Sequence, residues 1–377
     1  MTLATRPLGR SGLPITRLGF GSWAVGGGGW AFGWGPQDDA ASLATMRHAL
    51  ELGINWIDTA AAYGLGHSEE VVGRLLRELP LSRRPLIFTK CGLVWDEHDP
   101  MAPPRHVLKP DSIRRECEAS LRRLGVERID LYQFHWPDET GTAVEDSWAA
   151  MAKLVEEGKV RAAGVSNFDV TLLDRGEAIR HVDSVQPPFS LINRGAANHE
   201  IPWCASHDTG VIVYSPMQSG LLTDSFTAER ASSLADDDWR RRAPEFQPPL
   251  LGRNLRLRDA LRPIAQRHGA SVSSVAIAWV LAWPGVTGAI VGARTPKQVD
   301  GWVDAASLTL TPQDLDEIAA AIRRTRAGAG PVKAARPRAG RARSVWARRS
   351  GTVIVNAPGS PGRRDPASGR GSSSRDR

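Results

Sequence analysis

The sequence predicts an α/β protein, a (β/α)8 or TIM barrel with a long insertion after its seventh strand and a disordered basic C-terminal tail. Short apolar runs alternate with amphipathic helical patterns from Thr16 onward, which is typical of a parallel sheet whose strands are buried on both faces. Eight such runs have helices between them, and that number favours a closed barrel over an open sheet. The 377 residues, 41% of them hydrophobic, are enough to build one large core.

Each predicted strand is a short run rich in apolar residues. The strands are expected at Arg17–Trp23, Asn55–Thr59, Leu86–Cys91, Ile129–Trp136, Val160–Ser166, Ser184–Phe189, Gly210–Ser215 and Gly288–Gly292. Ahead of the first strand, a small hairpin within Gly9–Gly19 is expected under the barrel floor.

The predicted helices carry apolar residues at three- and four-residue spacing. They are expected at Asp38–Leu52, Ser68–Leu79, Asp111–Leu124, Val144–Glu157, Val170–Ile179, Val272–Leu281 and Pro312–Ile322. Asp111 is of a residue type that caps helix N-termini.

Two segments depart from the alternation of strands and helices. Residues 219–270 separate the seventh strand from its helix and include the basic, Pro-rich run Trp239–Pro249. An insertion at that end of a strand is more typical of a lid over substrate or cofactor than of filler. Residues 327–377 lack Leu, Phe, Tyr and Met, so we expect them to be disordered outside a barrel of residues 1–326.

The charge is unevenly distributed along the chain. The segment 327–377 holds eleven arginines, and the remaining residues include slightly more acidic than basic side chains. Charge therefore gives no support to nucleic-acid binding by the barrel. For the tail, an electrostatic arm for nucleic acid or acidic lipid is the alternative to plain disorder.

Composition also bounds the compartment. The only cysteines are Cys91, Cys117 and Cys204, which excludes a disulfide scaffold and fits the cytoplasm. No apolar signal segment follows Met1–Gly12. The uncharged stretch Gly269–Ala293 is interrupted by Pro284-Gly285, so we expect a helix and a strand of a soluble core there, not a membrane span.

Four residues near the C-terminal ends of predicted strands can act together, and this is where catalytic groups lie in such barrels. They are Asp58, Tyr63, Lys90 and His135. Each residue taken singly also has a purely structural interpretation. Asp58 would cap a loop, Tyr63 would be an aromatic residue at the rim, Lys90 a surface lysine and His135 a core histidine. Asp58, Lys90 and Tyr63 are expected to form a proton relay, in which an ammonium held by a carboxylate lowers the pKa of a tyrosine. The histidine would donate a second hydrogen bond to a carbonyl oxygen.

The loop after the first strand is expected to line the substrate mouth. Its run Gly26–Gly29 is not a dinucleotide fingerprint, because large aromatic residues follow it in place of a helix. Trp23, Trp30, Trp34 and Trp136 are candidates for an apolar wall, with simple packing as the alternative. Cys91 is expected to be an ordinary buried strand cysteine. The nine histidines show no His-x-x-x-His spacing, so we expect no catalytic metal.

Five motifs make the sequence recognisable as a whole. They are Gly53–Ser68, Ile87–Gly92, Asp130–Pro137, Gly158–Phe168 and Val213–Thr223. Through these motifs the chain resembles the aldo-keto reductase superfamily from about Arg6 to Pro331. The opening Gly21–Asp39 and the run Pro244–Pro249 look most like bacterial reductases of the inositol-operon and general-stress type.

The resemblance implies a role for each matching residue. It implies a catalytic tetrad of Asp58, Tyr63, Lys90 and His135, with Tyr63 as general acid. The residues implied to bind the cofactor are Ser166, Asn167 and Gln186 at the carboxamide, Tyr214 on the nicotinamide ring, Ser215, Pro216, Gly220 and Leu222 along the pyrophosphate, and Gly292, Arg294 and Gln298 at the adenosine end.

Three departures from many relatives fall at the nucleotide. Ser219-Gly220 replaces Gln-Gly, Asp224-Ser225 replaces Gly-Lys, and Trp302 stands where Asn is common. Arg294 and Lys297 remain available for a 2′-phosphate, which favours NADPH over NADH.

The expected activity is therefore NAD(P)H-dependent reduction of an aldehyde or ketone, or oxidation of a sugar or polyol alcohol. The alternative is an NADP(H)-sensing regulatory subunit with negligible turnover. The sequence specifies neither the physiological substrate nor the oligomeric state.

Overall fold

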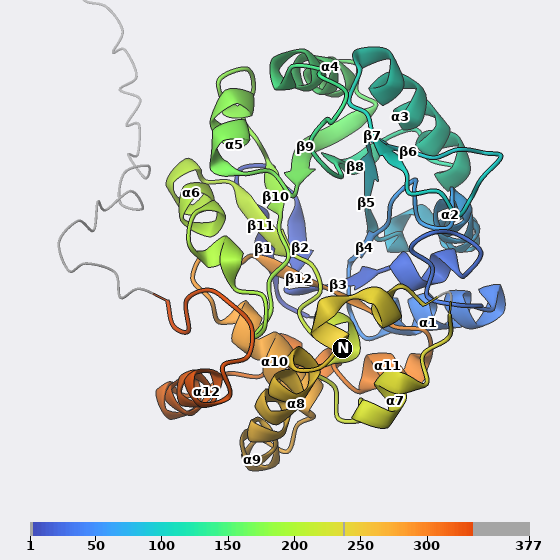
Figure 1. Ribbon diagram of the computed structural model, residues 1–377. Coiled ribbons are helices and arrows are strands. Elements are labelled where there is room, and N and C mark those ends of the chain that lie inside the picture. The colour runs from blue at the N-terminus through green and yellow to red at the C-terminus, as the bar shows by residue number, and fades with distance from the viewer. Residues whose placement is uncertain (1–2, 237, 335–377) are drawn as a thin grey trace, which may run out of the picture. The chain divides into compact units, whose positions relative to one another are not determined.

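Eight parallel strands close into a barrel in the computed structural model, which describes residues 3–236 and 238–334. Figure 1 looks into the barrel, with the helices arranged around it. The strands in barrel order are β3 (Leu18–Gly21), β4 (Trp56–Asp58), β5 (Leu86–Cys91), β8 (Ile129–Phe134), β9 (Val160–Ser166), β10 (Ser184–Gln186), β11 (Gly210–Val213) and β12 (Gly288–Gly292). The predicted (β/α)8 fold is confirmed.

Helices cover the outside of the barrel and hold most of the apolar core between themselves and the strands. They are α1 (Asp39–Glu51), α2 (His67–Glu78), α3 (Pro110–Leu124), α4 (Val144–Glu156), α5 (Val170–Glu177), α6 (Glu200–His207), α10 (Val272–Leu281), α11 (Pro296–Asp300) and α12 (Pro312–Thr325). Residues Gly269–Ala293 contain α10 and β12, as expected from the proline and glycine between them. Within the described part of the chain, no helix is both long and apolar enough to cross a membrane.

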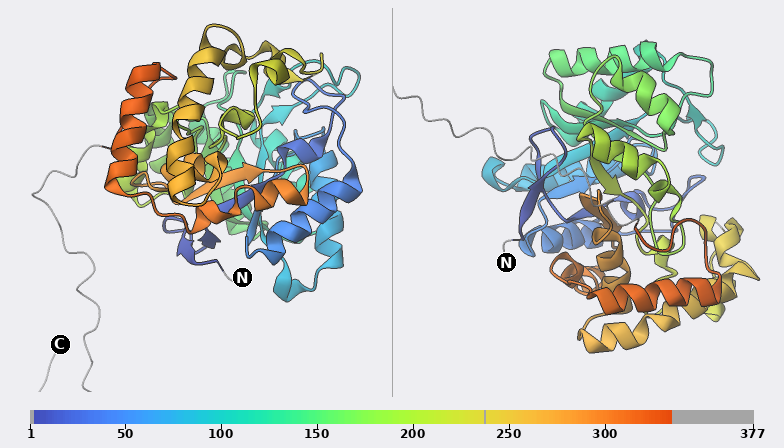
Figure 2. Two further views of the ribbon diagram at one scale, coloured as in Figure 1. Left: turned by 90° about the horizontal axis from the view of Figure 1, so that it is seen from below. Right: turned by 90° about the vertical axis from the view of Figure 1, so that its left-hand side faces the viewer.

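The insertion between β11 and α10 contains three short helices. They are α7 (Ala228–Ser232), α8 (Leu250–Ala260) and α9 (Arg262–Arg267). The intervening turns include Trp239–Arg242 and Pro244–Phe246. Figure 2 shows α8 packed beside α12.

The barrel floor is closed by a two-stranded hairpin, β1 (Thr5–Pro7) and β2 (Pro14–Thr16). Strand β2 lies within the predicted span Gly9–Gly19, whereas β1 lies ahead of it, so the hairpin begins earlier than expected. Figure 2 shows this hairpin next to the N-terminus. Its apolar residues close a second core cluster inside the barrel, made of Leu8, Leu13, Ile15, Trp56, Phe88, Leu131, Ala162, Ile212 and Ile290.

Two details of the predicted elements were wrong. Asp111 does not cap α3, because Pro110 occupies the first helical position and Lys109 the cap; proline suits that position since it has no N–H to leave unpaired. The segment from residue 327 is described as far as Ala334, and Arg194 binds the carbonyls of Ala327 and Gly330 at 3.3 Å each. The rest of the predicted tail, residues 335–377, lies outside the described residues.

Candidate active site

The four predicted catalytic residues meet at the C-terminal end of the barrel. Lys90 Nζ lies 2.5 Å from Asp58 Oδ1 and 3.4 Å from the Tyr63 hydroxyl, and it donates a further bond of 2.9 Å to the Thr59 carbonyl. Asp58 ends β4, Lys90 is in the neighbouring parallel strand β5, and His135 directly follows β8. Parallel neighbours therefore bring these groups to one rim.

The turn that carries Tyr63 packs against the loop after β3. Gly64 has a φ of +62°, and a Cβ there would lie 2.3 Å from the carbonyl oxygen of Gly26. A Cβ on Gly26 would in turn meet the backbone of Gly64 at 2.6 Å. The two glycines are needed because the backbones touch, and this contact fixes the position of Tyr63.

The Tyr63 ring lies between two other rings. Trp23 stacks on it with ring centroids 6.1 Å apart, and His135 approaches its edge at 5.6 Å. The Lys90 ammonium also lies over the Tyr63 ring, 5.1 Å from its centroid. The phenol is thus held by contacts on several sides.

Burial determines the resting protonation states. Burial, and then the charge of Asp58, raise the pKa of Tyr63 well above its usual value. Burial, followed by the charge of Lys90, lowers the pKa of His135 well below its usual value. At neutral pH the tyrosine therefore holds its proton and the imidazole is neutral. This direction for the Tyr63 pKa differs from the sequence-based expectation, because burial of the phenol and then the charge of Asp58 both disfavour the phenolate.

A chain of hydrogen bonds joins the four predicted catalytic residues to the predicted carboxamide residues. Gln186 Nε2 donates to Asp58 Oδ2 at 2.9 Å, and Ser166 Oγ donates to the Gln186 carbonyl at 2.8 Å. Asn167 Nδ2 bonds Ser166 Oγ at 3.0 Å and the His135 carbonyl at 2.9 Å. The Tyr214 hydroxyl donates to Asn167 Oδ1 at 2.9 Å. These residues are brought together, with Asn167 in the left-handed region at a φ of 61°.

Gln133 belongs to this network, and sequence reasoning missed it. Its Oε1 lies 3.4 Å from Gln186 Nε2, and its own Nε2 is buried with no hydrogen-bond partner among the described residues. The missed signal is the strand period of two, which puts Gln133 on the same face of β8 as His135.

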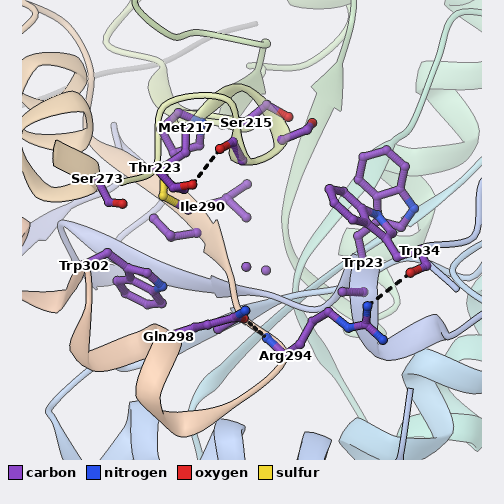
Figure 3. A pocket seen from close by; sticks show the side chains of 18 of the residues that line it. Trp23, Trp34, Ser215, Met217, Thr223, Ser273, Ile290, Arg294, Gln298 and Trp302 are labelled. Carbon is purple, nitrogen blue, oxygen red and sulfur yellow. Dashed lines mark hydrogen bonds between the residues drawn. The ribbon is translucent and has the colours of Figure 1, made fainter. Parts of the chain in front are cut away.

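A cavity of about 410 Å³ begins at Asp58 and Tyr63 and extends toward α11 (Figure 3). The predicted cofactor residues that line it are Tyr214, Ser215, Pro216, Gly220, Gly292, Arg294 and Gln298. Trp302 lines the same cavity with its indole N–H buried and unpaired within the described residues. Leu222 lies fully buried in the apolar core and does not line it. Ser166, Asn167 and Gln186 do not line it either. The cofactor roles of all these residues stay predictions.

The tryptophans that line the cavity are only in part the ones predicted. Trp23 and Trp34 line the cavity, and Trp239 of the insertion stacks on Trp23 with centroids 5.3 Å apart. Trp30 is 4% exposed, and its indole N–H bonds the Gly27 carbonyl. Trp136 stacks on His106. Neither Trp30 nor Trp136 lines the cavity, because Trp30 packs within its own loop and Trp136 packs on the segment that carries His106.

Two arginines connect the walls of the cavity. Arg240 pairs with Asp238 at 2.6 Å, and its guanidinium lies over the Trp34 ring, 4.6 Å from the centroid. Arg294 binds the loop after β3 through Gln37 Oε1 at 2.7 Å, the Trp34 carbonyl at 3.3 Å and the Pro36 carbonyl. Figure 3 shows the contact from Arg294 to Trp34. The guanidinium predicted to bind a 2′-phosphate is thus occupied with the loop.

The sequence also raised the questions of a reactive cysteine and of a metal site. Cys91 is buried, as predicted, and burial raises the pKa of its thiol. Residues 3–236 and 238–334 contain no group of three His, Cys, Asp or Glu side chains arranged to hold a metal ion. The absence of a catalytic metal stays a prediction.

Comparisons with known proteins agree with this geometry. The model of the Aldo/keto reductase family matches residues 17–323. The aldo-keto reductase YhdN of Bacillus subtilis is 35% identical over 309 residues, which cover 82% of this chain and 90% of that protein. The NADH-specific methylglyoxal reductase of Escherichia coli is 32% identical over 331 residues, or 84% and 99% of the two chains.

A solved structure is similar over most of the chain. It is the glycerol dehydrogenase AKR11B4 from Gluconobacter oxydans, with a TM-score of 0.78 and 37% identity. The match covers 88% of this chain and 98% of that one.

Proposed function

Because the chain belongs to the aldo/keto reductase family, we propose that it reduces an aldehyde or ketone with a nicotinamide dinucleotide and that Tyr63 is the general acid. The observation that carries the proposal is the position of the Tyr63 hydroxyl, 3.4 Å from the Lys90 ammonium and beside His135, on a residue that lines the cavity.

The residues present fit such a cofactor. Tyr214 offers an aromatic face beside the amide of Asn167, and Ser215 and Gly220 follow along the cavity wall. The unpaired indole N–H of Trp302 offers a donor near α11. When bound, the reduced nicotinamide supplies a hydride for the carbonyl carbon.

The protein's own residues supply the proton for the carbonyl oxygen and stabilise the negative charge that develops during reduction. Tyr63 holds the proton at its hydroxyl and transfers it to the carbonyl oxygen. Neutral His135 donates a second hydrogen bond to that oxygen. Lys90 stabilises the phenolate as it forms, and Asp58 keeps the ammonium in place at 2.5 Å. In the reverse direction, oxidation of an alcohol, the Tyr63 phenolate accepts the proton.

The names of two relatives suggest small substrates, methylglyoxal and glycerol. We propose a small carbonyl compound or polyol for this chain as well. The sequence favours NADPH through Arg294 and Lys297, while one relative is named NADH-specific. Since Arg294 binds the loop after β3, its remaining donors and other cations must provide any contact to a 2′-phosphate. Three buried free cysteines fit a cytoplasmic location.

Tyr63→Phe tests the proposal because it removes only the hydroxyl. We expect kcat for reduction to fall by about two to four orders of magnitude, with the Kd for the dinucleotide nearly unchanged. The measurement is NAD(P)H consumption at 340 nm with a panel of aldehydes and sugars, together with a binding titration.

Tyr132→Phe is the matched control. It removes the same group from a tyrosine that is fully buried in the outer core and does not line the cavity, so activity should persist. Retained turnover in Tyr63→Phe would exclude Tyr63 as the acid. Tight dinucleotide binding without turnover in the wild type would favour the regulatory-subunit alternative.

A further inference from the structure

We propose that Arg230, on helix α7 of the insertion, binds a phosphate group of the dinucleotide. The inference rests on the proposed function, since it assigns a charge partner to the cofactor in the same cavity. It concerns a residue that neither motif nor predicted element singled out.

Several charged side chains surround the cavity. Beyond the catalytic Asp58, the lining includes Arg230, Arg240, Arg294 and Asp224. A dinucleotide carries at least two negative charges on its pyrophosphate, and arginine is well suited to bind phosphate oxygens in pairs. The question is which of the three guanidinium groups is available.

The guanidinium of Arg240 already has hydrogen-bond partners within the protein. Two of its nitrogens bond the Asp238 carboxylate, at 3.0 and 2.6 Å, and Nη1 bonds the Ser219 carbonyl at 3.3 Å. Its guanidinium plane also covers Trp34. Asp238 cancels most of its charge, so a phosphate would gain little from it.

Arg294 is committed to the loop after β3. Its Nε and both terminal nitrogens donate to acceptors on residues 34–37. Turning toward a phosphate would leave these acceptors without a partner and release the loop.

Arg230 differs from Arg240 and Arg294 in its contacts with the described residues. The residue is exposed, and none of the residues in 3–236 or 238–334 forms a hydrogen bond or ion pair with its guanidinium. Its backbone is anchored, since its N–H bonds Thr227 Oγ1 at 3.1 Å in the cap of α7. Burial and then the charge of Arg240 lower the pKa of Arg294, and the charge of Arg230 adds to this lowering. Within residues 3–236 and 238–334, the Arg230 guanidinium therefore lies at the cavity without a bonded partner.

The helix end that opens on the same cavity is already occupied. Ser271 and Ser273 of this end line the cavity, but the Val272 N–H donates to Asp224 Oδ2 at 3.0 Å and the Ser274 N–H to Ser271 Oγ at 2.9 Å. The Asp224 carboxylate repels a phosphate there. The start of α10 therefore gives no substitute for Arg230.

The test uses adenosine fragments, which separate the two sources of phosphate. ADP carries the pyrophosphate, 2′-AMP carries the 2′-phosphate, and adenosine carries neither. Their Kd values would be measured by calorimetry on the full-length wild type, Arg230→Gln, Arg230→Lys and the matched control Arg256→Gln. Arg256 is an exposed arginine of the same insertion, on α8, and does not line the cavity.

We expect Arg230→Gln to raise the Kd for ADP, for 2′-AMP or for both by about 10-fold, while the Kd for adenosine stays constant. The fragment that weakens identifies the phosphate. Arg230→Lys should recover part of the affinity, and Arg256→Gln should match the wild type. Raising the ionic strength should weaken wild-type binding more than that of Arg230→Gln.

Two results would overturn the inference while leaving the proposed function intact. One is unchanged binding of both phosphorylated fragments by Arg230→Gln. The other is an equal loss for adenosine, which would mean that Arg230 shapes the cavity without contacting phosphate. A wild type that binds neither ADP, 2′-AMP nor the whole dinucleotide would overturn both proposals together.

Discussion

At the scale of single residues, Glu116 of α3 is the acid with the most unusual surroundings outside the tetrad. Its Oε2 accepts the Gly92 N–H at 2.8 Å, and its Oε1 accepts the Ser112 hydroxyl at 3.0 Å. Burial raises its pKa to about 7, against the lowering effects of these two bonds and of Arg115 and Arg123. The carboxyl thus links α3 to the backbone that follows β5.

Glu116 should make stability depend on pH in a defined window. The folded protein binds the proton more tightly than the unfolded chain, whose pKa is near 4.5. The protonated acid therefore contributes stability that is present below pH 4.5 and lost as pH rises through 7. The loss is at most about 3 kcal/mol. Urea unfolding of the wild type and Glu116→Gln between pH 4.5 and 8 measures it.

Subtracting the unfolding free energy of Glu116→Gln from that of the wild type at each pH cancels the contributions of all other titrating groups. The difference in unfolding free energy between the two proteins should change across this window and be flat above pH 8. A difference that is constant from pH 4.5 to 8 would contradict the raised pKa.

The sequence could predict which residues form the site but not all of their states. Strand ends identify Asp58, Lys90 and His135, because parallel strands bring such positions to one rim. The direction of the Tyr63 pKa shift depends on burial and on the pairing of Lys90 with Asp58. Neither is visible before the loops are packed.

At the scale of elements, the start of α12 is held by a buried carboxylate. Asp314 Oδ2 accepts the Thr311 N–H and hydroxyl, at 2.8 Å each, in a capping box. Arg267 and His268, at the end of α9, bond the same carboxylate at 2.6 and 2.8 Å. These contacts lower the pKa of Asp314 well below its usual range.

Asp314→Asn should destabilise the fold by about 1 to 3 kcal/mol, because it removes the charge from a buried carboxylate that accepts several hydrogen bonds. Glu317→Gln is the control, since Glu317 contacts the same Arg267 from an exposed position and should cost less than about 1 kcal/mol. Chemical unfolding at pH 7 measures both.

The sign of the pH dependence is the reverse of that for Glu116. The lowered pKa of Asp314 contributes stability that is present above pH 3.8 and lost as pH falls. The difference between wild type and Asp314→Asn should therefore shrink in acid. Equal costs for the two variants at pH 7 would show that the capping box is unimportant.

Elements with a strong repeating pattern were predictable, and short ones were not. Strands β5, β9 and β12 and helix α10 form over the expected residues. Helix α6, with eight residues and a proline, and α11, with five, carry too little periodicity to be recognised. The place of Trp239 against Trp23 depends on how the insertion folds back, which composition does not specify.

At the scale of the whole molecule, the cavity is built from distant parts of the chain. The ends of β3 and β12, the turn after β11 and the insertion all contribute lining residues. A ligand that touches all of them binds only the folded protein and must stabilise it.

Dinucleotide at 100 times its Kd should stabilise the protein by about 2.7 kcal/mol. Thermal unfolding scans at increasing NADPH and NADH concentration measure the effect. Tyr63→Phe should show the same stabilisation, because the proposed role of its hydroxyl is to act on the substrate and not on the dinucleotide. Free nicotinamide at equal concentration is the control, and no stabilisation at saturating dinucleotide would contradict the assignment of the cavity.

The seam between β3 and β12 has a consequence for the order in which the barrel is made on the ribosome. Phe20 pairs with Val291, about 270 positions later, which at ordinary elongation rates is roughly 15 to 55 s of synthesis. Until then, the first strand has no neighbour on one side and the nascent sheet presents an open, apolar edge. The growing chain is therefore most exposed to mispairing and most in need of chaperones just before the last strand leaves the exit tunnel.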